Sequence, residues 1–112
     1  MNIFLLEPTQ RILKWREFRK TLKNNIDEKE QLELVAEFWS HALLQTYSID
    51  YDNPNTWPSP WELIYEGGLC QTAIAYLMVQ TLILSGWNNK RIELYFLKNE
   101  KEQIMAVVID NK

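Results

Sequence analysis

A chain of 112 residues has room for one ordinary domain but not for a second hydrophobic core, so we expect a single domain over residues 1–112. Hydrophobic residues make up 46% of the chain and charged residues 24%, a balance that is typical of a folded protein and excludes a disordered one. The net charge is −3, and Lys and Arg gather only in the first predicted helix, which argues against nucleic acid as a partner.

The single cysteine and the hydropathy pattern argue against further classes of protein, namely disulfide-bonded, zinc-binding and membrane proteins. Cys70 is the only cysteine, so the chain forms no internal disulfide and cannot build a thiolate zinc site by itself. We therefore expect no metal, no cofactor and a reducing, cytoplasmic location. The longest apolar stretch, Thr72 to Trp87, is interrupted by polar residues and falls short of the roughly 18 to 20 residues that span a bilayer, which predicts a buried helix and no membrane partner.

The first half of the chain predicts two amphipathic helices. The first opens at Pro8 and extends to about Leu22, with apolar residues along one face. Solvated charges around such a helix explain its many basic residues, and a patch for anionic surfaces is the alternative. Asp27 and Glu30 form a capping box that begins a second helix, and apolar residues at helical spacing carry this helix to about Tyr47.

Two further helices are predicted after a polar loop. Ser59 to Glu62 is a compact start signal, with Ser as the N-cap, Pro at the first helical position and Glu at the third. This short helix ends at Gly67-Gly68, where a positive φ is allowed. The helix from Cys70 to Ser85 is apolar on nearly every side and stops at Gly86, which places it in the middle of the core.

The remainder of the chain predicts a β-hairpin. Residues 91–97 alternate and then turn apolar, residues 99–102 form a polar turn, and residues 103–109 end in an apolar run. Helices followed by a hairpin indicate an α+β fold, in which the buried Cys70 helix packs on a small antiparallel sheet under two N-terminal helices. Because one sheet edge would stay open, we expect either a strand formed by Ile3 to Leu6 or a homodimer.

Cys70 is the candidate for chemistry. It follows two glycines and stands at the start of a buried helix, where backbone N–H groups and the helix dipole favour a thiolate. A thiolate is the nucleophile of cysteine hydrolases. The alternative is that Cys70 is a small buried core residue without chemistry.

The pattern around this cysteine resembles the bacterial transglutaminase-like cysteine proteinases, which have a papain-like fold. That family shows a Trp-x-x-Pro-x-Glu segment, a glycine-rich turn and a helix that carries the nucleophilic cysteine. The matching residues here are Trp57, Pro60, Glu62, Gly67, Gly68 and Cys70. The family's histidine base begins a His-Ala-Val-Leu strand, and residues 105–109 occupy the corresponding place as Met-Ala-Val-Val-Ile. The resemblance covers about residues 55 to 110 and implies a papain-like, transglutaminase-like core with Cys70 as its nucleophile.

Departures from the family pattern point away from catalysis. Leu69 and Gln71 flank the cysteine where the family has Asp and Glu, and Met105 stands at the position of the base. A thioether cannot accept and return a proton near neutral pH, which a cysteine–histidine pair requires. His41, the sole histidine, is the alternative base if the second helix brings it close to Cys70, although a solvent-facing or capping histidine is the ordinary case.

Trp57 and Trp61, together with Trp87, are the candidate binding residues, as the lining of a groove for a peptide or a sugar. Packing against the Cys70 helix explains the same aromatic residues. We therefore predict a catalytically inactive papain-like domain that acts as a small binding or structural module for a protein or peptide partner, of a kind carried by bacteria and phages. The alternative is a cysteine hydrolase or acyltransferase in which Cys70 uses an unorthodox base.

Overall fold

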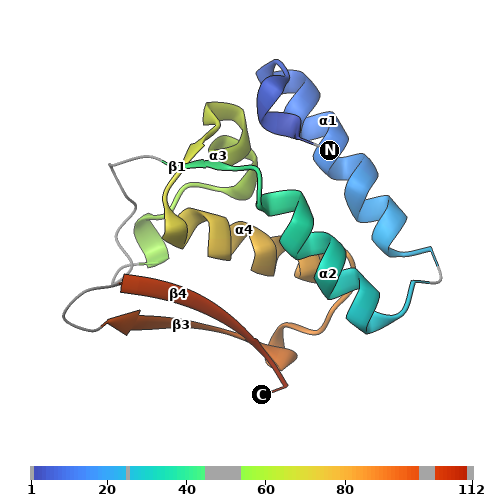
Figure 1. The fold of residues 1–112 in the computed structure, drawn as a ribbon, viewed down its shortest axis with the longest axis vertical. Helices are drawn as coiled ribbons and strands as arrows, with labels where there is room; N and C mark the ends of the chain where they lie inside the picture. Colours follow the sequence, from blue (N-terminus) through green and yellow to red (C-terminus); the bar gives the residue numbers. More distant parts are fainter. Residues whose placement is uncertain (1, 25, 45–53, 99–102, 111–112) are drawn as a thin grey trace.

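The architecture is mixed α+β, as predicted. The computed structural model describes residues 2–24, 26–44, 54–98 and 103–110. The elements, in chain order, are the 3₁₀ turn η1 (Ile3–Leu5), α1 (Pro8–Leu22), α2 (Glu28–Trp39), β1 (Leu43–Leu44), the 3₁₀ turn η2 (Pro54–Thr56), α3 (Pro60–Glu66), β2 (Gly68–Leu69), α4 (Gln71–Leu84), the 3₁₀ turn η3 (Asn89–Arg91), β3 (Ile92–Lys98) and β4 (Gln103–Ile109). Helix α4 lies in the middle, between the β3–β4 hairpin on one side and the other three helices on the other (Figure 1).

Local signals in the sequence set the beginnings and ends of most helices. The Asp27 side chain accepts a hydrogen bond from the backbone N–H of Glu30 at 2.8 Å and so caps α2. Ser59 caps α3 in the same way, and α3 ends at Gly67, whose φ is +82°. The predicted bounds of α1, α3 and α4 are confirmed to within a residue or two.

The expected continuation of α2 to Tyr47 is wrong. The helix ends at Trp39, and Ser40 donates a side-chain hydrogen bond to the Glu37 carbonyl at 2.6 Å. Beyond this turn, Leu43–Leu44 forms β1, which pairs in parallel with β2. Pairing with a distant segment therefore overrides the helical spacing of these apolar residues, and the end predicted at Tyr47 lies outside the described residues.

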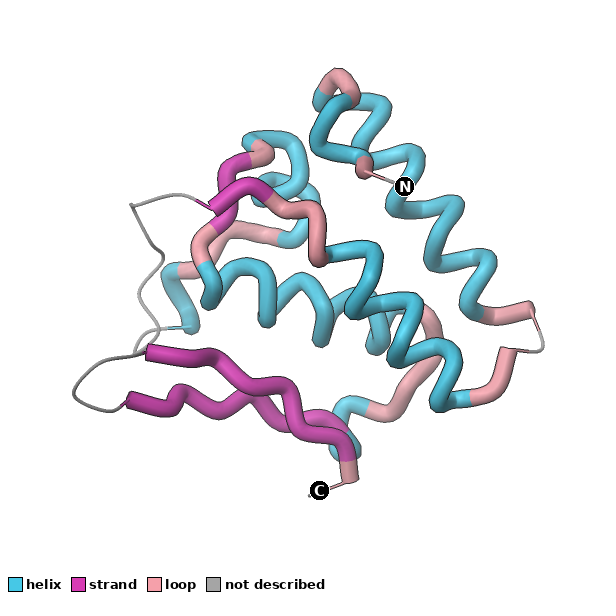
Figure 2. The backbone as a smooth tube through the Cα atoms, in the orientation of Figure 1, coloured by secondary structure: helices cyan, strands magenta, loops and turns pink. Residues whose placement is uncertain are grey.

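The predicted hairpin is confirmed over the described residues. Strands β3 and β4 pair antiparallel in a regular ladder from Ile92 opposite Ile109 to Lys98 opposite Gln103. The polar turn expected at residues 99–102 lies outside the described part. Figure 2 shows the two strands running beside α4; Ile92 belongs to the buried core, and Ile109 packs against it.

The N-terminal segment does not form the predicted edge strand. Ile3–Leu5 is a 3₁₀ turn, capped by the Asn2 side chain, which accepts a hydrogen bond from the backbone N–H of Phe4 at 3.0 Å. Ile3 is fully buried, and the Phe4 ring lies 6.0 Å from Trp39, so the segment joins the helical side of the core instead. The homodimer, the other half of this expectation, stays a prediction.

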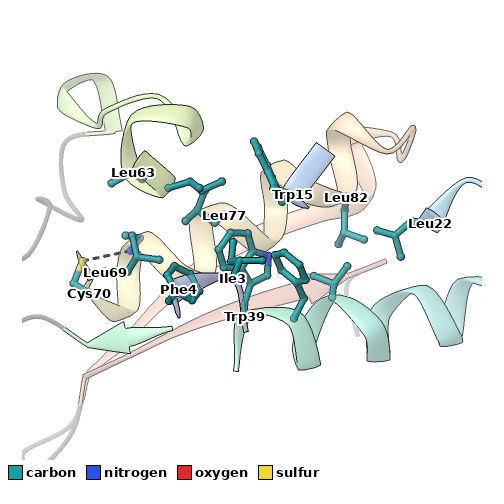
Figure 3. Packing of buried hydrophobic residues seen from close by; sticks show 14 of the residues in the cluster. Ile3, Phe4, Trp15, Leu22, Trp39, Leu63, Leu69, Cys70, Leu77 and Leu82 are labelled. Carbon is teal, nitrogen blue, oxygen red and sulfur yellow. Dashed lines mark hydrogen bonds between the residues drawn. The ribbon is translucent and has the colours of Figure 1, made fainter. Parts of the chain in front are cut away.

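A buried hydroxyl joins the three long helices at the centre of the core. Thr81 on α4 is fully buried, and its Oγ1 accepts a hydrogen bond from Trp15 Nε1 of α1 at 3.0 Å and from Trp39 Nε1 of α2 at 3.2 Å. The same hydroxyl donates to the Leu77 carbonyl at 2.6 Å. Figure 3 shows both indole rings beside α4, where Thr81 satisfies two N–H groups that would otherwise be buried without a partner.

An ion-pair cluster joins the hairpin to the start of α2. The Arg91 guanidinium donates to both carboxylate oxygens of Glu28, at 2.6 and 3.0 Å, and to both of Asp110, at 2.8 Å each. Its Cζ atom lies over the Trp87 ring, 4.7 Å from the ring centre. Every nitrogen of this side chain therefore already has a partner. Because no donor is left for an anion, the cluster stabilises the fold and is not an anion-binding site.

The Arg91 cluster predicts a pH dependence of stability. Hydrogen bonds from Arg91 lower the pKa of Glu28 below its ordinary value of 4.5. A carboxyl whose folded-state pKa is lowered stabilises the fold above its ordinary pKa, and this contribution disappears as the pH falls through the lower folded-state value. We expect Arg91→Gln to lower the melting temperature at neutral pH and to have a smaller effect well below pH 4.5. An equal loss at both pH values would contradict this account.

Candidate functional site

Cys70 is the N-cap of α4 and connects β2 to this helix. Its Sγ accepts a hydrogen bond from the backbone N–H of Ala73 at 3.4 Å (Figure 3). The residue is only 8% exposed and belongs to the core cluster. The preceding turn at Gly67 and the short β2 pairing together fix this position, so the local expectation of a cysteine at the helix start is confirmed.

The Cys70 sulfur acts as the N-cap acceptor of α4, as the side-chain oxygen of Ser or Asp commonly does in other helices. An N-cap side chain accepts a hydrogen bond from one of the otherwise unpaired N–H groups of the first turn. In the described part of the chain, the Ala73 N–H is the one group hydrogen-bonded to the Cys70 sulfur. Burial of the residue in the core restricts access to this sulfur.

His41 lies on the surface, in the turn between α2 and β1. Strands β1 and β2 run parallel, His41 precedes β1, and Cys70 follows β2, so the two residues come from opposite ends of this short pair. His41 is exposed while Cys70 is buried. The role of His41 as a base for Cys70 stays a prediction to which this arrangement adds no support.

Met105 lies in the third position of β4, with its backbone opposite Phe96 of β3. Helix α4 packs on β4, and the two elements run in the same direction, so that both begin at the same end of the molecule (Figure 1). Cys70 starts the helix at that end, and Met105 is close to the start of the strand. The place of Met105 as the position of a base stays a prediction.

The candidate binding residues Trp57 and Trp61 have separate partners. Trp57 is half-buried and packs edge-to-face on Tyr76 of α4, with ring centres 5.0 Å apart; burial raises the pKa of Tyr76. Trp61 packs edge-to-face on Trp15 at 5.7 Å but keeps 43% of its surface exposed. Trp57 is therefore explained by packing, whereas Trp61 still offers a face to solvent.

Trp87 does not belong with these two tryptophans. It follows Gly86 at the far end of α4, is 9% exposed, and donates its Nε1–H to Gln31 Oε1 at 2.8 Å. The expectation that Trp87 lines a groove with Trp57 and Trp61 is therefore wrong. A long-range hydrogen bond to α2 explains why this residue is buried.

Arg11, on the basic helix α1, caps the end of α3. Its Nη1 donates to the Tyr65 carbonyl at 2.8 Å and lies 3.5 Å from the Ile64 carbonyl oxygen. A cation at a helix C-terminus neutralises the negative end of the helix dipole. The φ of +82° favours glycine at position 67, and a Cβ there would lie 2.6 Å from the same Nη1, so that the end of the Arg11 side chain would have to shift. This partnership supports the structural explanation of at least one basic residue of α1.

Among the described residues, hollows also open on other parts of the surface. One, of about 270 Å³, lies between α1 and α2. Another, of about 540 Å³, is polar and lies beside the Arg91 cluster, whose donors are already occupied. The sequence predicted neither, because each is formed by residues from separate elements.

The described residues include neither a cluster of metal-ligating side chains nor a helix that could span a membrane. Within those residues, no three His, Cys, Asp or Glu side chains lie together in a way that could hold a metal ion. None of the helices that the structure describes has the length and apolar character to cross a bilayer.

Neither a protein-family model, nor a curated protein, nor a solved structure matches this sequence. The likeness to transglutaminase-like proteinases stays a prediction from the motif residues of the sequence.

Proposed function

We propose that this chain is a non-catalytic interaction module on a papain-like, transglutaminase-like core, with a cysteine at the nucleophile position but no base. The observation that carries the proposal is the contact of the Cys70 sulfur, which is buried and accepts the Ala73 N–H as a helix cap. The cysteine thus has a structural use that needs no proton transfer.

Catalysis by a cysteine requires a group that removes its proton and later returns it to the leaving group. Such a base must come within hydrogen-bonding distance of the sulfur, directly or through one water. Met105, at the position where the resemblance places the base, has no titratable group. His41, the single histidine, is exposed at the end of another helix.

The exposed aromatic residues of α3 favour binding over a purely structural role. Trp61 and Tyr65 stand four residues apart on this helix, with 43% and 49% of their surfaces exposed. Large aromatic side chains supply much of the energy of protein interfaces, and residues at this spacing share one helix face. A module that presents such a face is suited to a protein or peptide partner.

The alternative, a cysteine hydrolase or acyltransferase, is favoured by the position of Cys70 after two glycines at a helix start. The test is hydrolysis of peptide amides and acyl transfer from thioesters, measured for the unmutated protein and for Cys70→Ala. We expect both proteins to show the same background rate. Turnover that disappears in Cys70→Ala would overturn the proposal.

Met105→His is the constructive counterpart of this test. Since β4 begins at the same end of the molecule as α4, an imidazole at this position is expected to raise the reactivity of the Cys70 thiol towards alkylation at neutral pH. Met105→Gln is the matched control, because it adds polarity without a base. Equal rates in the two variants would mean that β4 does not occupy the place of the family's histidine strand.

A further inference from the structure

The groove between α1 and α2 is lined entirely by described residues of these two helices. Its volume is about 270 Å³. The lining residues are Lys14, Glu17, Phe18, Thr21, Leu34, Glu37 and Phe38. Pockets that bury a drug-sized molecule generally begin at about 300 Å³, so this groove has room for one large side chain of a partner.

The floor of the groove is aromatic. Phe18 of α1 and Phe38 of α2 stack with ring centres 4.2 Å apart and an angle of 13° between their planes. Phe38 is 6% exposed and belongs to the core, while Phe18 and Leu34 are half-buried and pack against the core. The floor is thus fixed by the core and presents apolar atoms to whatever enters.

The rim of the groove is acidic. On the α1 side, Lys14 is paired with Glu17 at 3.2 Å, so its charge is already balanced. On the α2 side, Glu37 has neither an ion pair nor a side-chain hydrogen bond within the described chain. Glu30 and Glu33 precede it at spacings of seven and four residues, which extends a stripe of carboxylates along the same side of α2.

Among the described residues, no Lys or Arg forms an ion pair with Glu30, Glu33 or Glu37. Across residues 8–22 and 28–39, which the structure describes completely, no ion pair joins α1 to α2. The Glu37 carboxylate is therefore free to pair with a cation from outside. An apolar floor with uncompensated carboxylates on its rim is complementary to an apolar side chain that has a basic neighbour.

We infer that this groove binds a segment of a partner protein that inserts one large apolar side chain and has Lys or Arg within a turn of it. This inference rests on the proposed function as an interaction module and adds the chemistry of the partner. The apolar side chain fills the space above the Phe18–Phe38 stack, and the basic residue pairs with Glu37.

In the test, short randomised peptides displayed on a carrier are selected for binding to the unmutated protein. The selected peptides are then tested for binding to Thr21→Trp. Thr21 is exposed and lines the groove, so a tryptophan there fills the space without entering the core. Thr9→Trp, at an exposed position of α1 outside the groove, is the matched control. We expect enriched peptides that combine an aromatic or branched apolar residue with nearby Lys or Arg, retained by Thr9→Trp and lost with Thr21→Trp.

Glu37→Lys provides a second, independent variant. Glu37 lies in the last turn of α2, where a cation is favourable to the helix, so this variant is expected to fold. It should weaken binding of a selected basic peptide at least about tenfold and shift the preference towards acidic neighbours. Peptides that bind both tryptophan variants equally, or that are enriched without basic residues, would overturn the inference.

Two further outcomes separate the inference from the proposed function. Failure to enrich any peptide, while Cys70-dependent turnover is also undetectable, removes the groove proposal and leaves the non-catalytic module. Self-association of the unmutated protein that Thr21→Trp abolishes would make a second copy the occupant and would also overturn the proposal. Cys70-dependent turnover would overturn the proposed function whatever the groove binds.

Discussion

Thr81→Val is expected to lower the free energy of unfolding by about 2 to 4 kcal/mol, since each buried polar group without a partner costs about 1 to 3 kcal/mol. Valine keeps the shape of threonine but removes the oxygen that accepts hydrogen bonds from Trp15 and Trp39. Both indole N–H groups would then be buried without an acceptor. The same substitution also frees the Leu77 carbonyl from its second hydrogen bond.

Thr81→Ser is the matched control for this prediction. Serine keeps the hydroxyl and removes one buried methyl group, which is expected to cost about 1 kcal/mol. Urea unfolding followed by circular dichroism at equal protein concentrations measures both changes. If valine proves as stable as serine, the hydroxyl does not hold the three helices together.

Gly67→Ala is expected to destabilise the protein by about 2 to 4 kcal/mol, because a strained backbone and a displaced contact add together. The φ of +82° is unfavourable for a residue with a Cβ. The new methyl group would also lie 2.6 Å from Arg11 Nη1, so the guanidinium that caps α3 must move. This shift weakens the hydrogen bond from Arg11 to the Tyr65 carbonyl.

A double-mutant cycle with Arg11→Ala separates the two costs. In the Arg11→Ala background the close contact is gone, so Gly67→Ala should cost only the backbone strain and therefore less than in the unmutated protein. Thermal unfolding of the four proteins gives the coupling energy. Strictly additive changes would mean that Arg11 and Gly67 do not depend on one another.

The helices and the hairpin could be predicted from the sequence because their signals are local. Ser59 with Glu62, and Asp27 with Glu30, are caps within one turn, and the strand pattern of residues 91–97 needs no distant partner to be recognised. The end of α2 could not be predicted, because it depends on β1 pairing with β2. Likewise, the 3₁₀ turn at Ile3–Leu5 reflects burial against helices far along the chain.

In the candidate site, too, local features could be predicted from the sequence, and features that depend on distant segments could not. Cys70 at a helix start follows from the glycines before it and the apolar helix after it, both visible in the sequence. Thr81 looked like a polar interruption of an apolar stretch, because its partners are Trp39 and Trp15, 42 and 66 residues away. The α1–α2 groove also depends on how two helices approach, which no single segment encodes.

The pH dependence of Cys70 alkylation is the most direct test of the claim that this cysteine has no base. The rate is measured with iodoacetamide across acid and neutral pH for the unmutated protein and for His41→Gln, with the modified residue identified by mass spectrometry. A thiolate paired with an imidazolium stays reactive in acid, whereas an isolated thiol loses its reactivity there. We predict superimposable profiles that fall to the background in acid. Acid reactivity in the unmutated protein that His41→Gln removes would contradict the account and make Cys70 and His41 a catalytic pair.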